Sequence, residues 1–454
     1  MTPQPFDIQL GMREIYHPSD IVHVPFGIRR ADLRSHLYMV GKTGTGKTTL
    51  IKHIVRQAIA QGIGVGVLDP HGALIDELLD EAIPEARIQD TILFAPGDRD
   101  WPVSLNLLHC ADTPSKVASG LVGTFEGLFG HSWGPRLEWI LFCSITTLAS
   151  AKNTSLLGLQ RLLVDPRYRA QLLRQVTDPI VLHFWHAEFD AWSERYRTEA
   201  IESIQNKVGQ LFASPELRNV LGQVSERIDM RTIMDTPGSI FLANLSKGAV
   251  GDDKAHLIGS FLVSLCRMAA MQREDTLEEE RQDYLLIADE FQNFVTASFA
   301  SALSEVRKYR LCLLLAHQYQ KQLREDIRDA VFGNVGSIIS FRVGNDTAAL
   351  LESELAPDVS ATQLVNLGRH AIYARIQEDG LPGVPFAGRT IRPAPRRYAQ
   401  REAIIAASRA RYAMPRAVVE DKIRRFVPRK TRRDGGYVRP PMKKSVVSQW
   451  ADAA

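Results

Sequence analysis

The chain has 454 residues, of which 45% are hydrophobic and 24% are charged. This is the composition of an ordinary globular protein, and it excludes a disordered chain, a collagen and a small disulfide scaffold. The best candidate for a membrane span, residues 255–266, is shorter than the ~18 residues that a membrane helix needs. Because Asp7, Arg13 and Glu14 stand where a signal peptide needs an apolar core, we expect a cytoplasmic protein without a transmembrane segment.

Charge is distributed unevenly along the chain. Residues 396–454 hold 16 Lys and Arg against 5 Asp and Glu, a net charge of +11, so residues 1–395 carry −8 of the total of +3. Basic runs such as PRKTRR attract phosphate backbones, although a solvated tail that binds nothing specific has the same composition. The tail by itself therefore leaves contact with nucleic acid open.

A nucleotide-binding motif follows residues 36–40, whose apolar side chains predict a buried strand. The pattern G-x-x-x-x-G-K-[ST] is matched by Gly41, Lys42, Thr43, Gly44, Thr45, Gly46, Lys47 and Thr48, with Thr49 next in the predicted helix. The glycines let backbone N–H groups turn toward phosphate oxygens, at the positive end of that helix. We therefore expect bound ATP, with Lys47 on its β and γ phosphates and Thr48 as a ligand of Mg²⁺.

A second predicted strand, residues 64–68, ends at Asp69, and His71 follows in the turn. Both residues would lie at the carboxyl edge of a parallel sheet, where ligands bind. Asp in this position is nevertheless more typical of a residue that forms the turn than of a catalyst.

Two adjacent carboxylates end another predicted strand, residues 284–288. Asp289 suits a ligand of hydrated Mg²⁺, and Glu290 suits a general base for the water that attacks the γ phosphate. Any strand can end in Asp-Glu at a turn, but a P-loop in the same chain favours the functional interpretation.

The next predicted strand, residues 311–316, ends at His317 and Gln318. A glutamine at the tip of the strand beside the acidic one could sense the γ phosphate. Before the strand come Arg307, Lys308 and Arg310, which suit either a solvated helix end or an arginine that acts in trans on a neighbouring subunit. The spacing alone leaves both interpretations open.

The 242 positions between Lys47 and Asp289 exceed what a few β-α units require. Residues 113–235 show many apolar patterns of helical period and few strand signals, so we expect an inserted all-α domain whose aromatic side chains form a core. The predicted α/β chain divides into an N-terminal extension (1–34), a first ATPase part (35–112), the all-α domain (113–235), a second ATPase part (236–379), and a linker with a basic tail (380–454).

These motifs together resemble the HerA/FtsK superfamily of P-loop motors, most closely the soluble part of TraG/TraD-type conjugative coupling proteins of type IV secretion systems. The resemblance spans about residues 29–344 and rests on LYMVGKTGTGKTTL, VLDPHG, SWGPRLEWIL, YLLIADEFQNF, VRKYRLCLLLAHQYQKQL and GNVGSIISFRVG. It implies a RecA-like P-loop NTPase fold, with a mainly parallel central sheet and an all-α domain between the two Walker motifs.

The same resemblance implies an ATP hydrolase in which Asp289 and Glu290 are the Walker B pair, Gln318 is the sensor and Arg307 is the trans arginine finger. It also implies a hexameric ring with ATP sites between subunits and DNA in the central channel. Coupling proteins usually begin with transmembrane helices, which we do not expect in this chain, so it would either reach the inner membrane through secretion or relaxosome partners or be a soluble relative.

The leading hypothesis is therefore an ATP-driven DNA translocase of conjugation or type IV secretion. One alternative is a secretion-assembly ATPase that never contacts DNA, and another is a HerA-like DNA-repair translocase that works with a nuclease. The nucleotide site serves all three equally, whereas stimulation of hydrolysis by DNA separates the first from the second.

Overall fold

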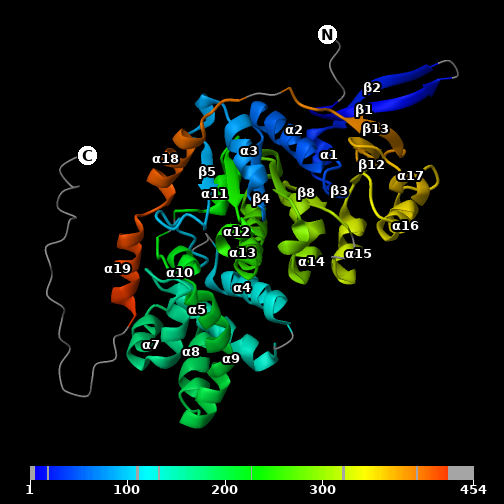
Figure 1. The fold of residues 1–454 in the computed structure, drawn as a ribbon. Helices are drawn as coiled ribbons and strands as arrows, with labels where there is room; N and C mark the ends of the chain where they lie inside the picture. Colours follow the sequence, from blue (N-terminus) through cyan, green and yellow to red (C-terminus); the bar gives the residue numbers. More distant parts are fainter. Residues whose placement is uncertain are drawn as a thin grey trace.

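A computed structural model describes residues 6–427, apart from residues 18–19, 109–111, 131–132, 226, 320–322 and 395–396. An 11-stranded sheet of order β2-β1-β13-β10-β9-β3-β8-β7-β4-β6-β5 forms its centre (Figure 1). The strands are β1 (Ile8–His17), β2 (Asp20–Ile28), β3 (Leu37–Val40), β4 (Gly64–Asp69), β5 (Thr91–Phe94), β6 (Ile240–Asn244), β7 (Tyr284–Ala288), β8 (Leu311–His317), β9 (Ser337–Ser340), β10 (Ala371–Arg375) and β13 (Phe386–Thr390). From β9 to β5 neighbouring strands are parallel, and from β9 to β2 they are antiparallel.

Helices cover both faces of this sheet. Those near the sheet are α1 (Arg30–Leu33), α2 (Lys47–Ala60), α3 (Ala73–Glu81), α12 (Lys247–Val250), α13 (Asp252–Gln272), α14 (Ala297–Val306), α15 (Glu325–Asn334), α16 (Asn345–Glu354), α17 (Ala361–Val365) and α18 (Arg401–Tyr412). Helix α19 (Arg416–Phe426) lies instead beside α10 (Pro215–Leu221). A short hairpin consists of β11 (Gln377–Glu378) and β12 (Leu381–Pro382). The fold is thus a RecA-like α/β sheet, as predicted.

Two apolar cores lie on the two faces of the sheet. In β3 alternate residues point to opposite sides, so that Leu37 and Met39 join the core beneath α2 and α3, whereas Tyr38 and Val40 join the core beneath α13 and α14. Strands buried on both faces read as continuous apolar runs, which is why β3, β4, β7 and β8 could be predicted from the sequence.

Between the adjacent strands β5 and β6 the chain forms a lobe of helices, seen below the sheet in Figure 1. It contains α4 (Pro114–Phe129), α5 (Pro135–Ser150), α6 (Gly158–Val164), α7 (Pro166–Leu173), α8 (Pro179–His183), α9 (Glu194–Ala213), α10 (Pro215–Leu221) and α11 (Met230–Asp235). Trp185 and Phe189 are fully buried, so these aromatic side chains belong to the core. That core is continuous with the one beneath α13, so lobe and sheet share one apolar interior.

Local sequence explains where several helices of the lobe begin. The side chain of Asp165 accepts hydrogen bonds from the backbone N–H groups of Arg167 and Tyr168, with Pro166 in the first turn. The side chains of Asp178 and Ser214 cap α8 and α10 in the same way, each followed by proline. An oxygen-bearing cap satisfies free N–H groups, and proline has none to satisfy, so these pairs start helices.

The N-terminal segment, which was predicted only as an extension over residues 1–34, adds two strands to the sheet. Strands β1 and β2 form a hairpin, and Gly11 to Arg13 of β1 pair with β13. The register shifts between Gln9 and Gly11, which interrupts the alternation of apolar and polar residues along β1. This interruption hid the strand at the level of sequence.

The segment predicted as a linker, residues 380–395, also contributes to the sheet, and that prediction is wrong. Its residues Phe386–Thr390 form β13, which pairs with β10 on one side and β1 on the other. The composition of this strand (FAGRT, with Pro and Gly residues nearby) favours a loop. Its extended conformation therefore depends on pairing with strands that are distant in sequence.

The first part of the predicted basic tail is folded against the body. Helix α18 lies along the edge strand β5, where the backbone N–H of Leu93 donates to Ser408 Oγ at 2.9 Å. Arg401 pairs with Asp76 and Asp80, and Arg409 pairs with Asp98. These arginines are therefore engaged within the molecule, while residues 428–454, with the PRKTRR run, lie outside the described part.

Deletion of residues 397–454 should destabilise the protein, because it uncovers the β5 edge and removes the apolar anchors Ile404, Val419 and Ile423. The lost burial is worth about 5 kcal/mol, which corresponds to a fall in Tm of about 10 °C. Deletion of residues 428–454 alone is the matched control and should leave Tm unchanged. Equal melting temperatures for the two truncated proteins, measured by calorimetry, would contradict this assignment.

Candidate nucleotide-hydrolysis site

The P-loop follows β3 at the carboxyl edge of the sheet and leads into α2. Gly44 and Gly46 have φ of 75° and 126°, which residues with a Cβ atom rarely adopt. A Cβ atom on Gly46 would also lie 2.6 Å from Nδ1 of His370, which packs behind the loop. The backbone N–H of His370 donates to the carbonyl of Thr45 at 2.8 Å, so the loop is braced from outside. His370 was not predicted, because it comes from the distant start of β10.

Lys47 begins α2, and its ammonium group is folded onto the loop. Nζ donates to the carbonyl of Gly41 and lies 3.5 Å from that of Lys42. Burial lowers the pKa of Lys47, and the carboxylates of Glu290 and Asp289 oppose that shift. The positive charge is thus held where phosphate oxygens would replace the loop carbonyls as its partners.

Asp289 follows β7 and is 8% exposed. Burial first, then the charges of Glu290 and Asp69, raise its pKa to about 7, while Lys47 acts in the opposite direction. Carboxylates crowded at a strand end beside a buried ammonium group form a site that a cation would stabilise. Thr48, on the first turn of α2, is exposed, so its hydroxyl is accessible to a ligand.

These residues fit a Mg²⁺ ion that arrives with a nucleotide. Among the described residues there is no cluster of three or more His, Cys, Asp or Glu side chains that could hold a metal. A protein cage is not required, because Mg²⁺ in such sites is bound by one or two protein oxygens together with phosphate oxygens and water.

Glu290 is held at both ends of its carboxylate. Gln318 Nε2 donates to Oε1 at 2.8 Å, and Gln292 Nε2 donates to Oε2 at 2.9 Å. The residue is 5% exposed and has the left-handed conformation, with φ of 48°. That conformation costs about 1–2 kcal/mol for a residue other than glycine, and such strain gathers at functional sites.

Gln318 links this carboxylate to the P-loop. Thr43 Oγ1 donates to Gln318 Oε1 at 3.0 Å, so the amide bridges the two Walker motifs. Residues 43, 290 and 318 thus form one chain of hydrogen bonds across a site predicted from three separate motifs. Gln292, two residues after Glu290, was missed, although a polar side chain at the end of a Walker B turn is a signal that could have identified it.

His317, the last residue of β8, is fully buried. Its Nε2 lies 2.5 Å from Tyr38 Oη, and Phe291 packs edge-on against its ring. Burial, reinforced by Lys47, lowers the pKa of His317 to about 3, so the ring is neutral. It supports the strand end that carries Gln318 and is available neither as an acid nor as a cation.

Asp69 caps a helix, as its place in a turn predicted. Its carboxylate accepts hydrogen bonds from the backbone N–H groups of His71, Leu74 and Ile75, at 2.8 to 3.2 Å. It is 1% exposed and acts on the site through its charge beside Asp289. The side chain of His71 is exposed and contributes nothing to this cap.

Arg307 does not join the other predicted site residues. It lies in the short helix η7 (Arg307–Tyr309) before β8, at the amino edge of the sheet, whereas Gln318 follows the carboxyl end of the same strand. The seven residues of β8 span about 20 Å, which a guanidinium cannot bridge. Arg307 therefore cannot serve the nucleotide site of its own chain, which leaves the two interpretations of its sequence position, a solvated helix end and a role in trans.

Known proteins share this fold. Residues 18–184 match the family model of the type IV secretion-system coupling protein DNA-binding domain. The plasmid coupling protein TrwB in complex with ADP and Mg²⁺ is 16% identical, with a TM-score of 0.59 over 87% of this chain and 96% of that one. This chain has the fold of a coupling-protein ATPase. The resemblance to TraG/TraD-type proteins is thus confirmed for the fold, and for residues 18–184 by the family match.

Two further structures extend the comparison. TrwB in complex with a non-hydrolysable ATP analogue is 14% identical, with a TM-score of 0.56 over 87% of this chain and 97% of that one. VirB4 of Thermoanaerobacter pseudethanolicus is also 14% identical, with a TM-score of 0.52 over 86% of this chain and 98% of that one. No curated protein matches the sequence. None of the helices in the described part of the chain is both long and apolar enough to cross a membrane.

Replacement of Asp289 by Asn should stabilise the nucleotide-free protein at pH 8 while it abolishes hydrolysis. The pKa of Asp289 is raised to about 7 on folding, so the protein loses stability as pH rises from the unfolded value of about 4 through 7, and the neutral amide escapes this loss. Calorimetry in EDTA should show a higher Tm than wild type at pH 8, and this difference should shrink as pH falls and vanish below about pH 4, where the carboxyl is protonated in both the folded and the unfolded state. The exposed-site control Glu280→Gln should show no pH-dependent difference, and a lower Tm for Asp289→Asn at pH 8 would contradict the burial argument.

Proposed function

We propose that the protein is an ATP-driven motor that translocates DNA in conjugative transfer or type IV secretion. The observation that carries the proposal is the series of hydrogen bonds from Thr43 through Gln318 to Glu290, which lies beside Lys47 and Asp289. It occurs in a protein whose residues 18–184 match a coupling-protein DNA-binding domain. ATP and Mg²⁺ are the substrate and cofactor that this site suits.

In this mechanism the backbone of residues 41–49 and Lys47 bind the phosphates. Mg²⁺, held by Thr48 and Asp289, would neutralise charge that develops on the phosphate oxygens. Glu290 accepts the proton of the attacking water. A γ phosphate that draws Gln318 away from Glu290 would free Oε1 for that water, so the amide reports whether triphosphate is present.

The site is completed by a neighbouring subunit. Arg307 is exposed at the opposite edge of the sheet from the P-loop of its own chain. A ring of subunits in head-to-tail contact would bring each Arg307 to the next nucleotide, which supports a homo-oligomer, and we propose a hexamer. We further propose that the ring works in the cytoplasm and meets the inner membrane through secretion or relaxosome proteins.

The structural similarity to VirB4 supports a second candidate, a secretion-assembly ATPase that moves protein and does not bind DNA. Its nucleotide chemistry would be the same, so the active-site residues cannot separate the two. Contact with DNA is the property that differs. A third candidate, a HerA-like repair translocase, would bind DNA and co-purify with a nuclease.

The decisive measurement is the ATPase rate of the purified oligomer with and without single- and double-stranded DNA, at low and moderate salt, with Glu290→Gln as the blank. We expect DNA to raise the rate several-fold and the stimulation to fade as salt increases, because contacts to phosphates release counterions. No stimulation in an oligomer confirmed by sedimentation would exclude the DNA motor and favour the protein-secretion candidate.

Replacement of Arg307 by Ala should lower kcat by about 1,000-fold, the effect of losing a trans arginine, and should leave the Kd for nucleotide unchanged. Arg424→Ala, which removes an exposed cation of α19, outside this turn, is the matched control and should hydrolyse ATP at the wild-type rate. Lys47→Ala should abolish hydrolysis through the chain's own site. A wild-type rate of ATP hydrolysis in assembled Arg307→Ala rings would contradict the role of Arg307 at the nucleotide site of a neighbouring subunit.

A further inference from the structure

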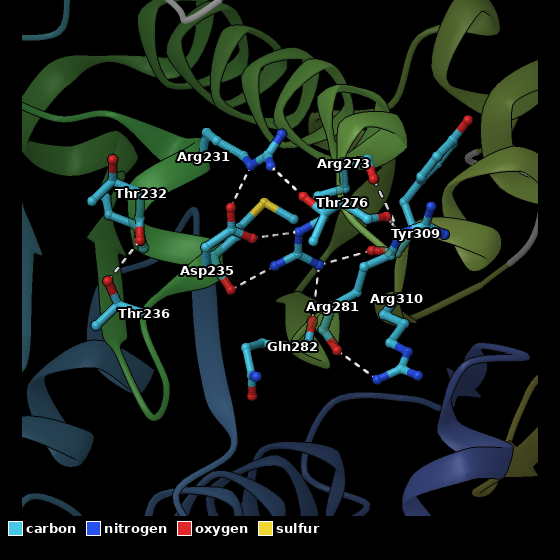
Figure 2. Close-up of polar contacts among 12 residues, drawn as sticks. Arg231, Thr232, Asp235, Thr236, Arg273, Thr276, Arg281, Gln282, Tyr309 and Arg310 are labelled. Carbon is cyan, nitrogen blue, oxygen red and sulfur yellow. Dashed lines mark hydrogen bonds and ion pairs between the residues drawn. The ribbon is translucent and has the colours of Figure 1, made fainter. Parts of the chain in front are cut away.

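A fully buried arginine lies at the amino edge of the sheet, opposite the nucleotide site. Arg273 directly follows α13 and has 0% of its surface exposed, and its Nε donates to Asp235 at 2.8 Å. Its terminal nitrogens donate to the carbonyls of Met234 at 2.5 Å, Gln282 at 2.9 Å and Tyr309 at 2.7 Å. Figure 2 shows this guanidinium between Asp235 and the carbonyls of residues 282 and 309.

A second arginine extends the cluster. Arg281 Nε donates to the carbonyls of Arg273 at 3.1 Å and Thr276 at 3.0 Å, and its Nη1 donates to that of Lys308 at 2.8 Å. Arg310 in turn donates to the carbonyl of Arg281 at 2.5 Å. We call Arg273, Arg281 and Arg310 with these partners the arginine clamp (Figure 2).

The arginine clamp holds residues that lie just before two neighbouring strands of the sheet, β7 and β8. Gln282 lies just before β7, and Lys308 and Tyr309 belong to η7, just before β8. The carboxyl ends of these two strands carry Glu290 and Gln318. The clamp therefore fixes the turn that carries Arg307 against the amino ends of the strands that carry the catalytic groups.

Arg307 itself projects from this fixed turn. It is exposed, and its guanidinium makes no hydrogen bond or ion pair with the other residues that the structure describes. It lines an open pocket of about 470 Å³ in which three side chains are cationic; the lining residues are Ala31, Arg34, Glu278, Ser304, Arg307 and Lys308. An unpaired guanidinium on a rigid base, beside a pocket rich in cations, suits an anionic group brought by another molecule.

Stability does not explain this arrangement well. A buried guanidinium loses its hydration, and apolar side chains of similar volume usually give equal or greater stability. Four of the five N–H donors of Arg273 are nevertheless satisfied, three of them by carbonyls of separate segments, namely α11, the turn before β7 and η7. The planar guanidinium of Arg273 holds these segments in one fixed geometry. Such rigidity is what a reactive side chain on a neighbouring turn needs for accurate placement.

We propose that Arg273 and Arg281 are positioning residues for Arg307, and that they set the geometry in which its guanidinium reaches the γ phosphate bound by the neighbouring subunit. This inference rests on the proposed function, because it assigns the clamp to the trans half of that site. Through Gln282 and Tyr309 the same clamp joins Arg307 to the strands that carry Glu290 and Gln318 of its own chain.

Arg281→Ala is the better variant for a test, since Arg281 is half-buried whereas Arg273 is fully buried and its loss would endanger folding. We expect kcat to fall by about 100-fold, the cost of misplacing a reacting group, with KM within about two-fold of wild type. Arg227→Ala is the matched control, because Arg227 also donates to two carbonyls, those of Arg411 and Ala413, but lies outside the clamp. It should keep wild-type kcat.

Mixed rings distinguish positioning from a general structural role. Arg281→Ala subunits keep an intact Glu290, and Glu290→Gln subunits keep an intact Arg307 turn, so their mixture should regain activity above either protein alone. A mixture of Lys47→Ala with Glu290→Gln, both defective in their own sites, should stay inactive. Recovery in the first mixture but not in the second is the result expected, with assembly checked by sedimentation.

Wild-type kcat in Arg281→Ala, or a loss that the mixture fails to restore, would overturn the inference. Failure of the proposed function itself looks different, since Arg307→Ala would then hydrolyse ATP normally. If Arg307→Ala is inactive while Arg281→Ala is normal, only the positioning role is wrong. The kcat of the double variant Arg281→Ala/Arg307→Ala should equal that of Arg307→Ala alone, because both changes remove the same interaction.

Discussion

The parallel pairing of β3, β8 and β7 is the constraint on which the site depends. Parallel neighbours end at the same edge of a sheet, so Val40 lies opposite His317, and Ala288 opposite Leu315. The P-loop, Gln318 and Glu290 meet there although 242 positions separate Lys47 from Asp289. The backbone ladder brings these strand ends to one edge, and the bridge from Thr43 through Gln318 to Glu290 joins their side chains.

The two edges of the same sheet divide the chemistry. The carboxyl edge gathers Lys47, Asp289 and Glu290, where burial and like charge raise the pKa of Asp289 and the surrounding structure holds Glu290 in the strained left-handed region. Without nucleotide, the buried carboxylates and the strained backbone at this edge lower the stability of the folded protein, as is common for a site preorganised to bind a cation and a phosphate. The amino edge gathers arginines that bind carbonyls, and it presents Arg307 outward.

The helical lobe is connected to both edges. It enters after β5 and returns before β6, and its core is continuous with that beneath α13, the helix that ends at Arg273. A shift of the lobe would therefore act on a packed interior that reaches the arginine clamp. Close packing transmits such shifts, so a movement of the lobe has a physical route to the turn that carries Arg307.

The sequence by itself determined the parts that local physics dictates. Strands buried on both faces read as apolar runs. Gly44 and Gly46 of the P-loop adopt positive φ values that only glycine tolerates readily. The pair Asp289-Glu290 directly follows a buried strand, which is where carboxylates can reach a ligand at the edge of the sheet. Tertiary structure decided the rest, since β1 and β13 pair with partners far along the chain against weak local patterns. In the same way, the bracing by His370, the burial of His317, the amide of Gln292 on Glu290 and the arginine clamp depend on contacts between segments whose proximity only the folded sheet creates.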